Sequence, residues 1–141
     1  MMEVILQFDE GIPDACPPVD AEDTDCIVFR AITELPISAD HFKSWVKAKL
    51  PNAKQHECRH WGLSVWTTME AVEHARGINT VMRSSYIAAA QLSQGDGLIK
   101  ATPTRPQPKH HTLWCDINAN MPAKFTVVLE PEIEGNDHVG Y

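Results

Sequence analysis

Histidine and cysteine side chains gather in two short segments that could together bind zinc. In HECRH, His56, Cys58 and His60 lie two residues apart, so in an extended chain they point to the same side. In HHTLWC, His111 and Cys115 share a side in the same way. Imidazole and thiolate groups are usual zinc ligands. If the two segments are neighbouring strands, we expect a zinc site at His60, His111 and Cys115; the alternative is a partly exposed histidine cluster beside buried free thiols.

The same residues could instead act as a nucleophile and its base. Pairing Cys58 or Cys115 with His60 or His111 would place a thiol beside an imidazole that can remove its proton. Like the zinc site, this arrangement requires the two segments to lie side by side. An enzyme built on the His/Cys cluster is therefore a second reading of these residues.

Polar residues follow a particular order through three expected strands. Arg30 lies in VFRAI, Ser64 and Thr67 lie in GLSVWTT, and Glu130 and Glu132 lie in LEPE. An arginine in an early strand, a Ser/Thr-bearing strand leading into a helix and a late Glu-x-Glu follow one another. This order resembles that of the arginine-serine-glutamate ADP-ribosyltransferases.

The resemblance implies an NAD-dependent enzyme with three site residues. Arg30 would hold a phosphate of the nicotinamide dinucleotide through its planar guanidinium. Ser64 would orient the ribose, and Glu132 would stabilise the oxocarbenium-like transition state. The residues by themselves also allow a simpler interpretation, in which Arg30 faces solvent and the others are strand caps or surface carboxylates.

Trp61 and Trp66 are expected to contribute to ligand binding, together with His60 and His111. The two tryptophans differ in strand parity, so in a regular strand they face opposite sides of the sheet. If one face of the sheet is open, the tryptophan on that face is an anchor for a ligand or a partner surface. If both faces are covered, both tryptophans belong to the core.

The segment that carries most of these residues predicts a strand followed directly by a helix. Residues 61–66, WGLSVW, show the period of two that is typical of a strand. Thr67 and Glu70 match a capping box at the start of a helix. Gly77 offers the left-handed residue that ends one.

The other elements follow from apolar periodicity. A second helix is expected from Ser38 to about Leu50, because Phe42, Trp45, Val46 and Leu50 repeat at helical spacing. Strands are expected at residues 4–8, 26–32, 85–92, 98–102, 110–115 and 125–129.

These elements predict an α+β fold: a single mixed, mostly antiparallel sheet of about five to six strands with two helices packed on it. Residues 93–97, SQGDG, predict a hairpin-like turn. In the first half each helix follows a strand, which allows parallel pairing. We expect an acidic arm at residues 1–25, a single domain at 26–130 and a tail at 131–141.

The arm carries the net charge of the chain, which is −7. Residues 1–25 hold eight acidic residues and no Lys or Arg, which gives −8 and leaves +1 for the remainder. A nucleic-acid-binding protein needs a dense basic face to displace counterions. The sequence therefore argues against nucleic acid as a partner.

The sequence favours a soluble cytoplasmic protein. No apolar run approaches the roughly 18 residues of a membrane span, and the N-terminus lacks the basic region of a secretory signal. The cysteines, Cys16, Cys26, Cys58 and Cys115, are widely spaced and include no CxxC pair. We therefore expect four reduced thiols and no membrane partner.

Taken together, these patterns favour a small binding domain with a protein or small-molecule partner. The chain has no glycine-rich phosphate loop, GxSxG elbow, HExxH motif or EF-hand loop. The competing class is an enzyme, through either ADP-ribosyl transfer or chemistry at the His/Cys cluster. The patterns specify no cofactor beyond the NAD of the resemblance and the zinc of the His/Cys hypothesis.

Overall fold

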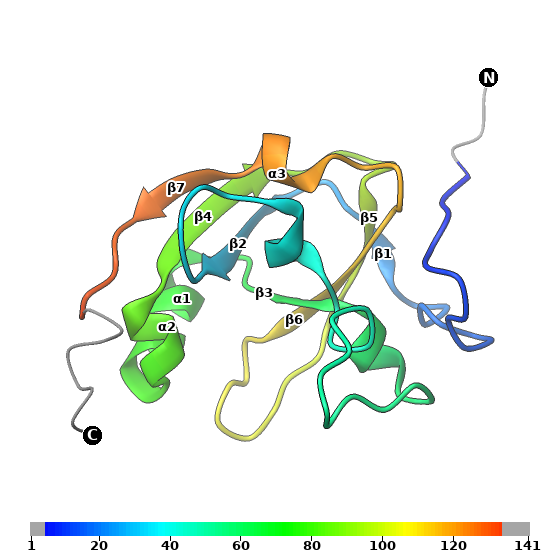
Figure 1. The fold of residues 1–141 in the computed structure, drawn as a ribbon, viewed down its shortest axis with the longest axis horizontal. Helices are drawn as coiled ribbons and strands as arrows, with labels where there is room; N and C mark the ends of the chain where they lie inside the picture. Colours follow the sequence, from blue (N-terminus) through cyan, green and yellow to red (C-terminus); the bar gives the residue numbers. More distant parts are fainter. Residues whose placement is uncertain (1–4, 134–141) are drawn as a thin grey trace.

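Two antiparallel β-sheets pack face to face in the computed structural model, which describes residues 5–133 (Figure 1). One sheet has the strand order β1-β5-β6-β3, and the other has the order β2-β4-β7. The strands are Glu22–Asp23 (β1), Ile27–Ile32 (β2), Leu63–Val65 (β3), Tyr86–Gln91 (β4), Gly97–Ala101 (β5), His111–Cys115 (β6) and Thr126–Leu129 (β7). The helical segments are Ala39–Phe42 (η1), Cys58–Trp61 (η2), Met69–Ile78 (α1), Thr80–Ser84 (α2) and Met121–Lys124 (α3), of which η1 and η2 are 3-10 helices.

The main hydrophobic core lies between the two sheets. Val28 and Ile32 of β2 contribute to it, as do Leu63 and Val65 of β3 and Leu113 of β6. Burying an aliphatic side chain of this size stabilises a fold by about 1.5–3 kcal/mol. Because strand side chains alternate between faces, the burial of residues 63 and 65 turns residue 64 outward.

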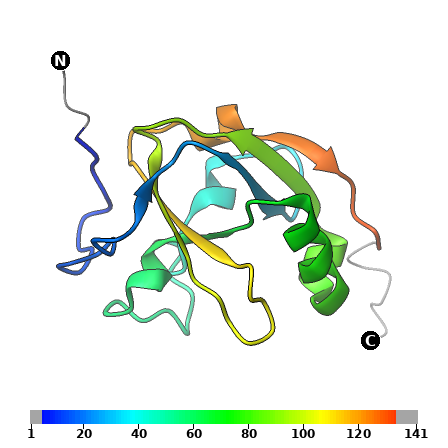
Figure 2. The same ribbon diagram turned by 180° about the vertical axis from the view of Figure 1, so that it is seen from behind.

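A second core lies under α1 and α2, which cover the other face of the three-stranded sheet (Figure 2). Val72 and Ala75 of α1 and Met82 of α2 pack there with Ile87 of β4. Because β4 pairs with β2 on one side and β7 on the other, it is covered on both faces and both edges. The small residues of its YIAAAQ sequence fit this position.

A backbone bridge joins the two sheets beside the helices. The amide of Phe29 in β2 donates to the carbonyl oxygen of Trp66 (2.7 Å), and the amide of Trp66 donates to that of Phe29 (3.0 Å). This pair of hydrogen bonds fixes the end of β3 against β2. The bridge also brings Arg30, the residue after Phe29, close to Ser64, which lies two residues before Trp66.

The α+β class and most of the expected strands are confirmed. The five segments expected at residues 26–32, 85–92, 98–102, 110–115 and 125–129 correspond to β2, β4, β5, β6 and β7. All strand pairs among the described residues are antiparallel. The antiparallel character of the prediction is therefore right, whereas its parallel component is wrong, because β2 pairs with β4 across the helices that separate them in sequence.

The expected single sheet is wrong, because the turn at residues 93–97 passes the chain from one sheet to the other. The carboxylate of Asp96 accepts from the amide of Ser93 (2.7 Å), so the turn forms where it was expected. However, β5 then pairs with β6 and β1 instead of folding back on β4. Gly97 lies so close to the carbonyl oxygen of Trp114 that a Cβ there would clash.

The prediction of a helix from Ser38 to about Leu50 is wrong for the residues after its first turn. Only η1 forms, and the residues that follow it make irregular turns. Trp45 and Leu50, two residues of the expected apolar stripe, are 49% and 45% exposed. The apolar stripe therefore has no core to face over most of its length, and the hydroxyl of Ser44 accepts from the amide of Lys47 (3.1 Å) instead.

The strand expected at residues 61–66 forms, but it is shorter than the sequence pattern predicted. Trp61 ends η2, and the regular strand covers only residues 63–65. The prediction that HECRH is extended is also wrong, because η2 begins at Cys58. Trp61 and Trp66 are both buried, at 9% and 5% exposure, so neither is an open anchor on a sheet face.

The helix expected after this strand is confirmed, with its ends shifted by one residue. Thr68, not Thr67, is the N-cap, and its hydroxyl accepts from the amide of Ala71 (3.0 Å). The helix continues through Gly77 to Ile78. The side chain of Asn79 then caps α2 by accepting from the amide of Met82 (3.0 Å).

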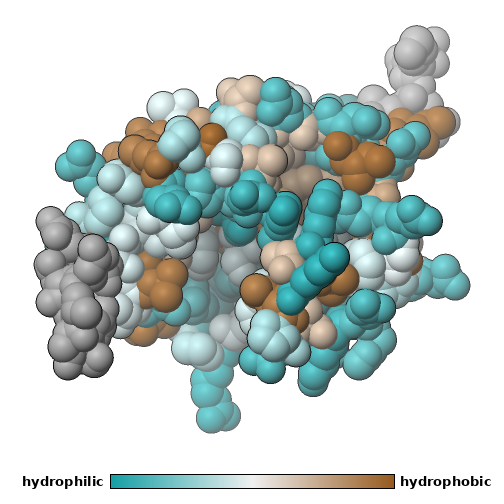
Figure 3. Space-filling view, in the orientation of Figure 1, coloured by the Kyte–Doolittle hydropathy of each residue, from teal (hydrophilic) through white to brown (hydrophobic). Residues whose placement is uncertain are grey.

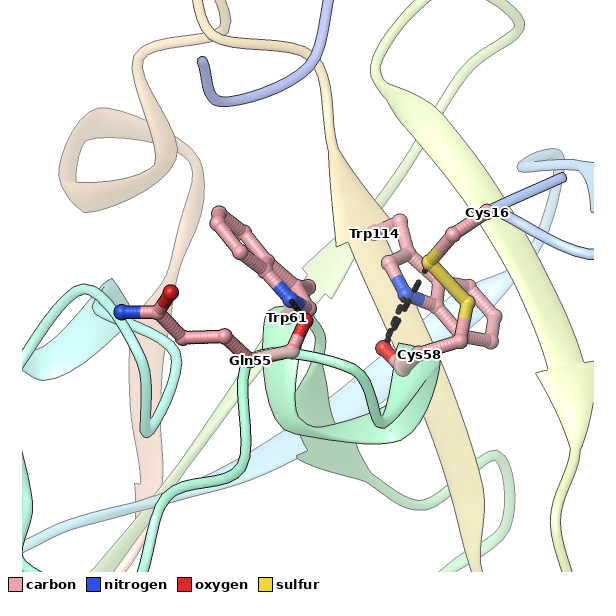
Figure 4. The surroundings of a disulfide bond; sticks show 5 residues. All are labelled: Cys16, Gln55, Cys58, Trp61 and Trp114. Carbon is pink, nitrogen blue, oxygen red and sulfur yellow. Dashed lines mark hydrogen bonds between the residues drawn. A yellow bond between two sulfur atoms is a disulfide. The ribbon is translucent and has the colours of Figure 1, made fainter. Parts of the chain in front are cut away.

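A disulfide between Cys16 and Cys58 contradicts the expectation of four reduced thiols (Figure 4). It ties the N-terminal arm to η2. The carbonyl oxygen of Cys58 accepts from the indole of Trp114 (3.0 Å), and the indole of Trp61 donates to the carbonyl oxygen of Gln55 (2.8 Å). Cys26 and Cys115 are free. Because stable disulfides form mainly in oxidising compartments, the thiol argument for the cytoplasm no longer holds.

The described part of the arm lies against the rest of the chain. Its residues Glu22–Asp23 form β1, and Asp9 and Asp20 make ion pairs with Lys47 (3.2 Å) and Lys100 (2.9 Å). The strand expected at residues 4–8 is wrong for residues 5–8, which are irregular, and residue 4 lies outside the described residues. Residues 134–141 of the expected tail also lie outside them.

Within residues 5–133, no helix combines the length and the apolar character that a membrane crossing requires.

Candidate functional site

A pocket of about 380 Å³ opens where β2 and β3 lie side by side. Small-molecule sites generally measure roughly 300–1,000 Å³, so the pocket has room for a small ligand. It is lined from both sheets and from three connecting segments: η2, the turns after η1, and the loop of residues 102–110. The polar and charged side chains that matter most are Arg30, Lys43, Arg59, His60, Ser64 and His110.

Arg30 is held rigidly in this pocket by two backbone carbonyl groups. Its Nε donates to the carbonyl oxygen of His41 (2.8 Å), and its Nη1 donates to that of Ser64 (2.8 Å). Burial lowers the pKa of Arg30 to about 10, so the guanidinium remains a cation at neutral pH. The arginine in the middle of an apolar strand therefore finds its partners on the backbone.

Ser64 of β3 and His110 form a hydrogen-bonded pair that lines the pocket. The Ser64 Oγ lies 2.8 Å from Nε2 of His110. On the other side of the ring, Nδ1 lies 3.2 Å from the carbonyl oxygen of Thr102 and 2.9 Å from its Oγ1. A proton on Nδ1 donates to Thr102 and leaves Nε2 free to accept from the Ser64 hydroxyl. Both contacts are therefore satisfied by one tautomer of His110.

The surroundings of His110 fix its ring and favour its neutral form. The edge of the ring meets Trp66 in a T-shaped contact at 5.8 Å between centroids. The hydroxyl of Thr102 is itself 2.7 Å from that of Thr112. Burial lowers the pKa of His110, the positive charges of Arg59 and His111 lower it further, and the hydrogen bond to Thr102 opposes this shift. His110 is therefore uncharged at neutral pH.

The electrostatic character of the pocket is cationic. Arg30, Lys43 and Arg59 line it, and within residues 5–133 no Asp or Glu does. Lys43 makes an exposed ion pair with Asp40 (2.9 Å), which lies outside the pocket. A surface of this kind attracts anions, and guanidinium groups bind phosphate or carboxylate with geometric specificity.

Aromatic side chains add flat apolar surface beside these cations. Trp45 is 49% exposed and tilts against the ring of His60, with 4.8 Å between centroids. Nδ1 of His60 accepts from the backbone amide of Lys54 (2.9 Å). Trp66 is buried at the base of the pocket, where its indole donates to the side-chain oxygen of Gln107 (3.0 Å). The pocket thus offers an aromatic edge next to a cationic one.

The structure brings together four of the residues that the sequence suggested: Arg30, Ser64, His60 and Trp66. The others lie elsewhere. Trp61 and Cys115 line a separate pocket of about 200 Å³, and His111 lines a third one.

The expected zinc site does not assemble. In the part of the chain that the structure describes, no three His, Cys, Asp or Glu side chains are placed to hold a metal ion. His111 pairs with Val65 across β3 and β6, whereas His60 lies in η2 and lines a different pocket. Cys58 is in the disulfide, and burial raises the pKa of Cys115 to about 12. Cys115 is therefore a protonated thiol, which also removes it as a nucleophile.

Glu132 does not join Arg30 and Ser64. Its carboxylate pairs with Nη1 of Arg76 (3.1 Å), and its amide donates to the carbonyl oxygen of Arg83 (2.8 Å). It does not line the pocket that contains the other two residues. Of the expected arginine-serine-glutamate set, Arg30 and Ser64 therefore lie together in the pocket, and Glu132 does not.

No family model, curated protein or solved structure matches this chain. Its function is consequently argued from the geometry of the pocket. Sequence reasoning missed three residues there: Lys43, Arg59 and His110. Lys43 follows η1, in the stretch where the sequence predicted a longer helix that does not form. His110 was considered only as the start of a strand, although its place beside His111 in HHTLWC was visible.

Proposed function

We propose that the protein binds a small anionic ligand of the nucleotide class in the pocket between β2 and β3. The observation that carries this proposal is the charge of the pocket. Three cationic side chains and no described carboxylate line it, although the chain as a whole has a net charge of −7. Clustering cations in an acidic protein costs electrostatic repulsion, which a bound anion relieves.

The aromatic side chains support a ligand that is both flat and anionic. A nucleobase stacking on Trp45 would gain about 0.5–1.5 kcal/mol beyond its buried area. A phosphate near Arg59 and Lys43 would make charge-assisted hydrogen bonds. Together these two features distinguish a nucleotide from inorganic phosphate and from an uncharged nucleoside.

A protein partner receives less support on the face that Figure 3 shows. In Figure 3, hydrophobic residues on the face shown form several small areas separated by hydrophilic ones. Protein-binding surfaces usually present a larger contiguous apolar patch. The pocket, in contrast, combines concavity with convergent polar groups, as small-molecule sites do.

Titration with adenosine monophosphate, adenosine and inorganic phosphate tests the proposal. We expect the monophosphate to bind most tightly, because it alone uses both the aromatic and the cationic sides of the pocket. Isothermal calorimetry measures the three affinities, and a change in tryptophan fluorescence that is lost in Trp45→Phe reports that the ligand lies against Trp45. Equal affinity for the monophosphate and for either fragment would contradict the proposal.

Charge reversal at Lys43 and Arg59 is expected to weaken binding of the monophosphate at least tenfold, or about 1.4 kcal/mol. Both side chains are exposed, so the double variant K43E/R59E should fold. The matched control is K49E/K54E, which changes charge equally at exposed lysines outside the pocket. If both double variants bind alike, general charge and not the pocket accounts for the affinity.

ADP-ribosyl transfer from NAD is a second candidate function. It is supported by one contact, the hydrogen bond from Arg30 to the backbone of Ser64 within a cationic pocket. Because Glu132 pairs with Arg76, the reaction would need a carboxylate from elsewhere. Nicotinamide release from NAD by the wild type, abolished in Arg30→Lys, would support transfer. Binding of NAD without release would exclude it.

A further inference from the structure

We propose that Ser64 and His110 form a nucleophile–base pair that hydrolyses small carboxylic esters bearing a second anionic group. The choice of an anionic substrate rests on the proposed function, since it uses the same cationic pocket. The nucleophilic chemistry is independent of it. The juxtaposition that carries the inference is the 2.8 Å contact between Ser64 Oγ and His110 Nε2 at the pocket wall.

The pair has the geometry that activation of a serine requires. A nucleophile and its base should lie within about 2.6–3.2 Å, with a third group orienting the base. Thr102 is that third group, because its carbonyl oxygen and Oγ1 both face Nδ1 of His110. Thr112 in turn holds the Thr102 hydroxyl, and Trp66 contacts the ring edge.

The scaffold presents Ser64 to a ligand in a fixed orientation. Its neighbours Leu63 and Val65 are buried in the core at 4% and 0% exposure, whereas Ser64 itself is exposed. The serine therefore cannot turn away without dislodging β3. Lys43 and Arg59 line the same pocket, where their positive charge can bind the carboxylate of a substrate.

The reaction balances with water as the only co-reactant. Ser64 Oγ forms a bond to the ester carbonyl carbon while its proton passes to His110 Nε2. The bond from that carbon to the alcohol oxygen then breaks, and His110 returns the proton to the departing alcohol. Water, losing a proton to His110 Nε2, next attacks the acyl carbon. The bond from that carbon to Ser64 Oγ breaks, His110 returns the proton to Ser64 Oγ, and a carboxylic acid is released. Overall, ester and water become acid and alcohol.

Reaction with para-nitrophenyl acetate tests the pair without involving the anion site. We expect a burst of para-nitrophenolate and an acetyl group located on Ser64 by peptide mass spectrometry. S64A should abolish the burst, and H110Q should slow it by about 100-fold, the usual contribution of a general base. Circular dichroism verifies that both variants are folded. The control is S93A, in which an exposed serine outside the pocket is replaced; it should react as the wild type does.

The wild type provides a readout that does not depend on any variant. The burst rate should fall as the pH drops through the lowered pKa of His110, because the protonated imidazole cannot accept from Ser64. Acetylation confined to other residues, or a burst unchanged in H110Q, would overturn the inference. Acetylation of Ser64 that depends on His110 and on pH would establish it.

The mono-para-nitrophenyl ester of succinic acid separates this inference from the proposed function. It should react at least tenfold faster than the acetate, and K43E/R59E should lose that preference. Equal rates for the two esters would overturn the anionic substrate while leaving the nucleophilic pair in place. Failure with both esters would overturn the pair, and nucleotide binding would still be judged by its own titration.

Discussion

Replacing Arg76 with methionine is expected to lower the free energy of unfolding by about 3 kcal/mol. The guanidinium of Arg76 is buried at the end of α1, where Nη2 donates to the carbonyl oxygens of Ser85 (2.9 Å) and Glu130 (2.9 Å). The buried carbonyl group of Ser85, left without a partner, costs about 1–3 kcal/mol, and the part-buried one of Glu130 adds to this loss. Methionine keeps much of the apolar stem, so the loss reports on the hydrogen bonds more than on packing. Urea unfolding followed by tryptophan fluorescence measures it.

The matched control for this variant is Glu132→Gln. Glu132 is the outer partner of Arg76 and its side chain is 52% exposed, and exposed ion pairs contribute only about 0–1 kcal/mol. We therefore expect a small effect at Glu132 beside a large one at Arg76. Equal losses would show that the ion pair, and not the bonds to the backbone, anchors the helix. A small loss in both would mean that Arg76 does not hold α1 to β4 and β7.

The sequence contained a signal for the burial of Arg76. Met69, Val72 and Arg76 repeat at intervals of three and four, the spacing of one helical face. An arginine on an apolar face has to find acceptors, and the ends of β4 and β7 supply them. Glu132 was assigned a catalytic role from its place in the Glu-x-Glu of the resemblance. Its contact with Arg76 joins residues 56 positions apart and is not visible in a local pattern.

Local patterns predicted the strands well and the sheets poorly, for a physical reason. Alternation between faces is a property of a few neighbouring residues, and it predicted the orientation of Ser64 between Leu63 and Val65. The choice of a strand's partner depends on long-range packing. The turn at residues 93–97 looks the same whether β5 folds back on β4 or passes to β6, and so the number of sheets was not predictable from it.

The candidate site could be predicted only in part for the same reason. Arg30 and Ser64 were singled out by their order along the chain, which resembles that of the ADP-ribosyltransferases. Their meeting with His110 depends on the β3–β6 pairing and on a loop that closes between residues 102 and 110. The zinc hypothesis was wrong because it depended on the local shape of the chain. It assumed an extended segment around Cys58, whereas that residue begins η2 and forms a disulfide.

Removing the disulfide with Cys16→Ala and Cys58→Ala is expected to cost about 4 kcal/mol of unfolding free energy. The two cysteines are 42 residues apart, and for a loop of that length the chain-entropy model gives about this value. The loss should extend beyond entropy, because the bond anchors η2, whose Cys58 carbonyl group accepts from Trp114. Thermal unfolding followed by circular dichroism, with and without dithiothreitol, measures the effect.

Reductant should lower the melting temperature of the wild type and of Cys26→Ser, and it should leave that of the double variant unchanged. Cys26→Ser is the proper control, since Cys26 is a free thiol. Alkylation of the denatured, unreduced protein should modify Cys26 and Cys115 and spare Cys16 and Cys58. Modification of all four would show that the arm is not tied to η2. The arm would then be held to the body by β1, by its ion pairs and by the hydrogen bonds of Gln7 to Asp116 (2.7 Å) and Ile117 (2.9 Å).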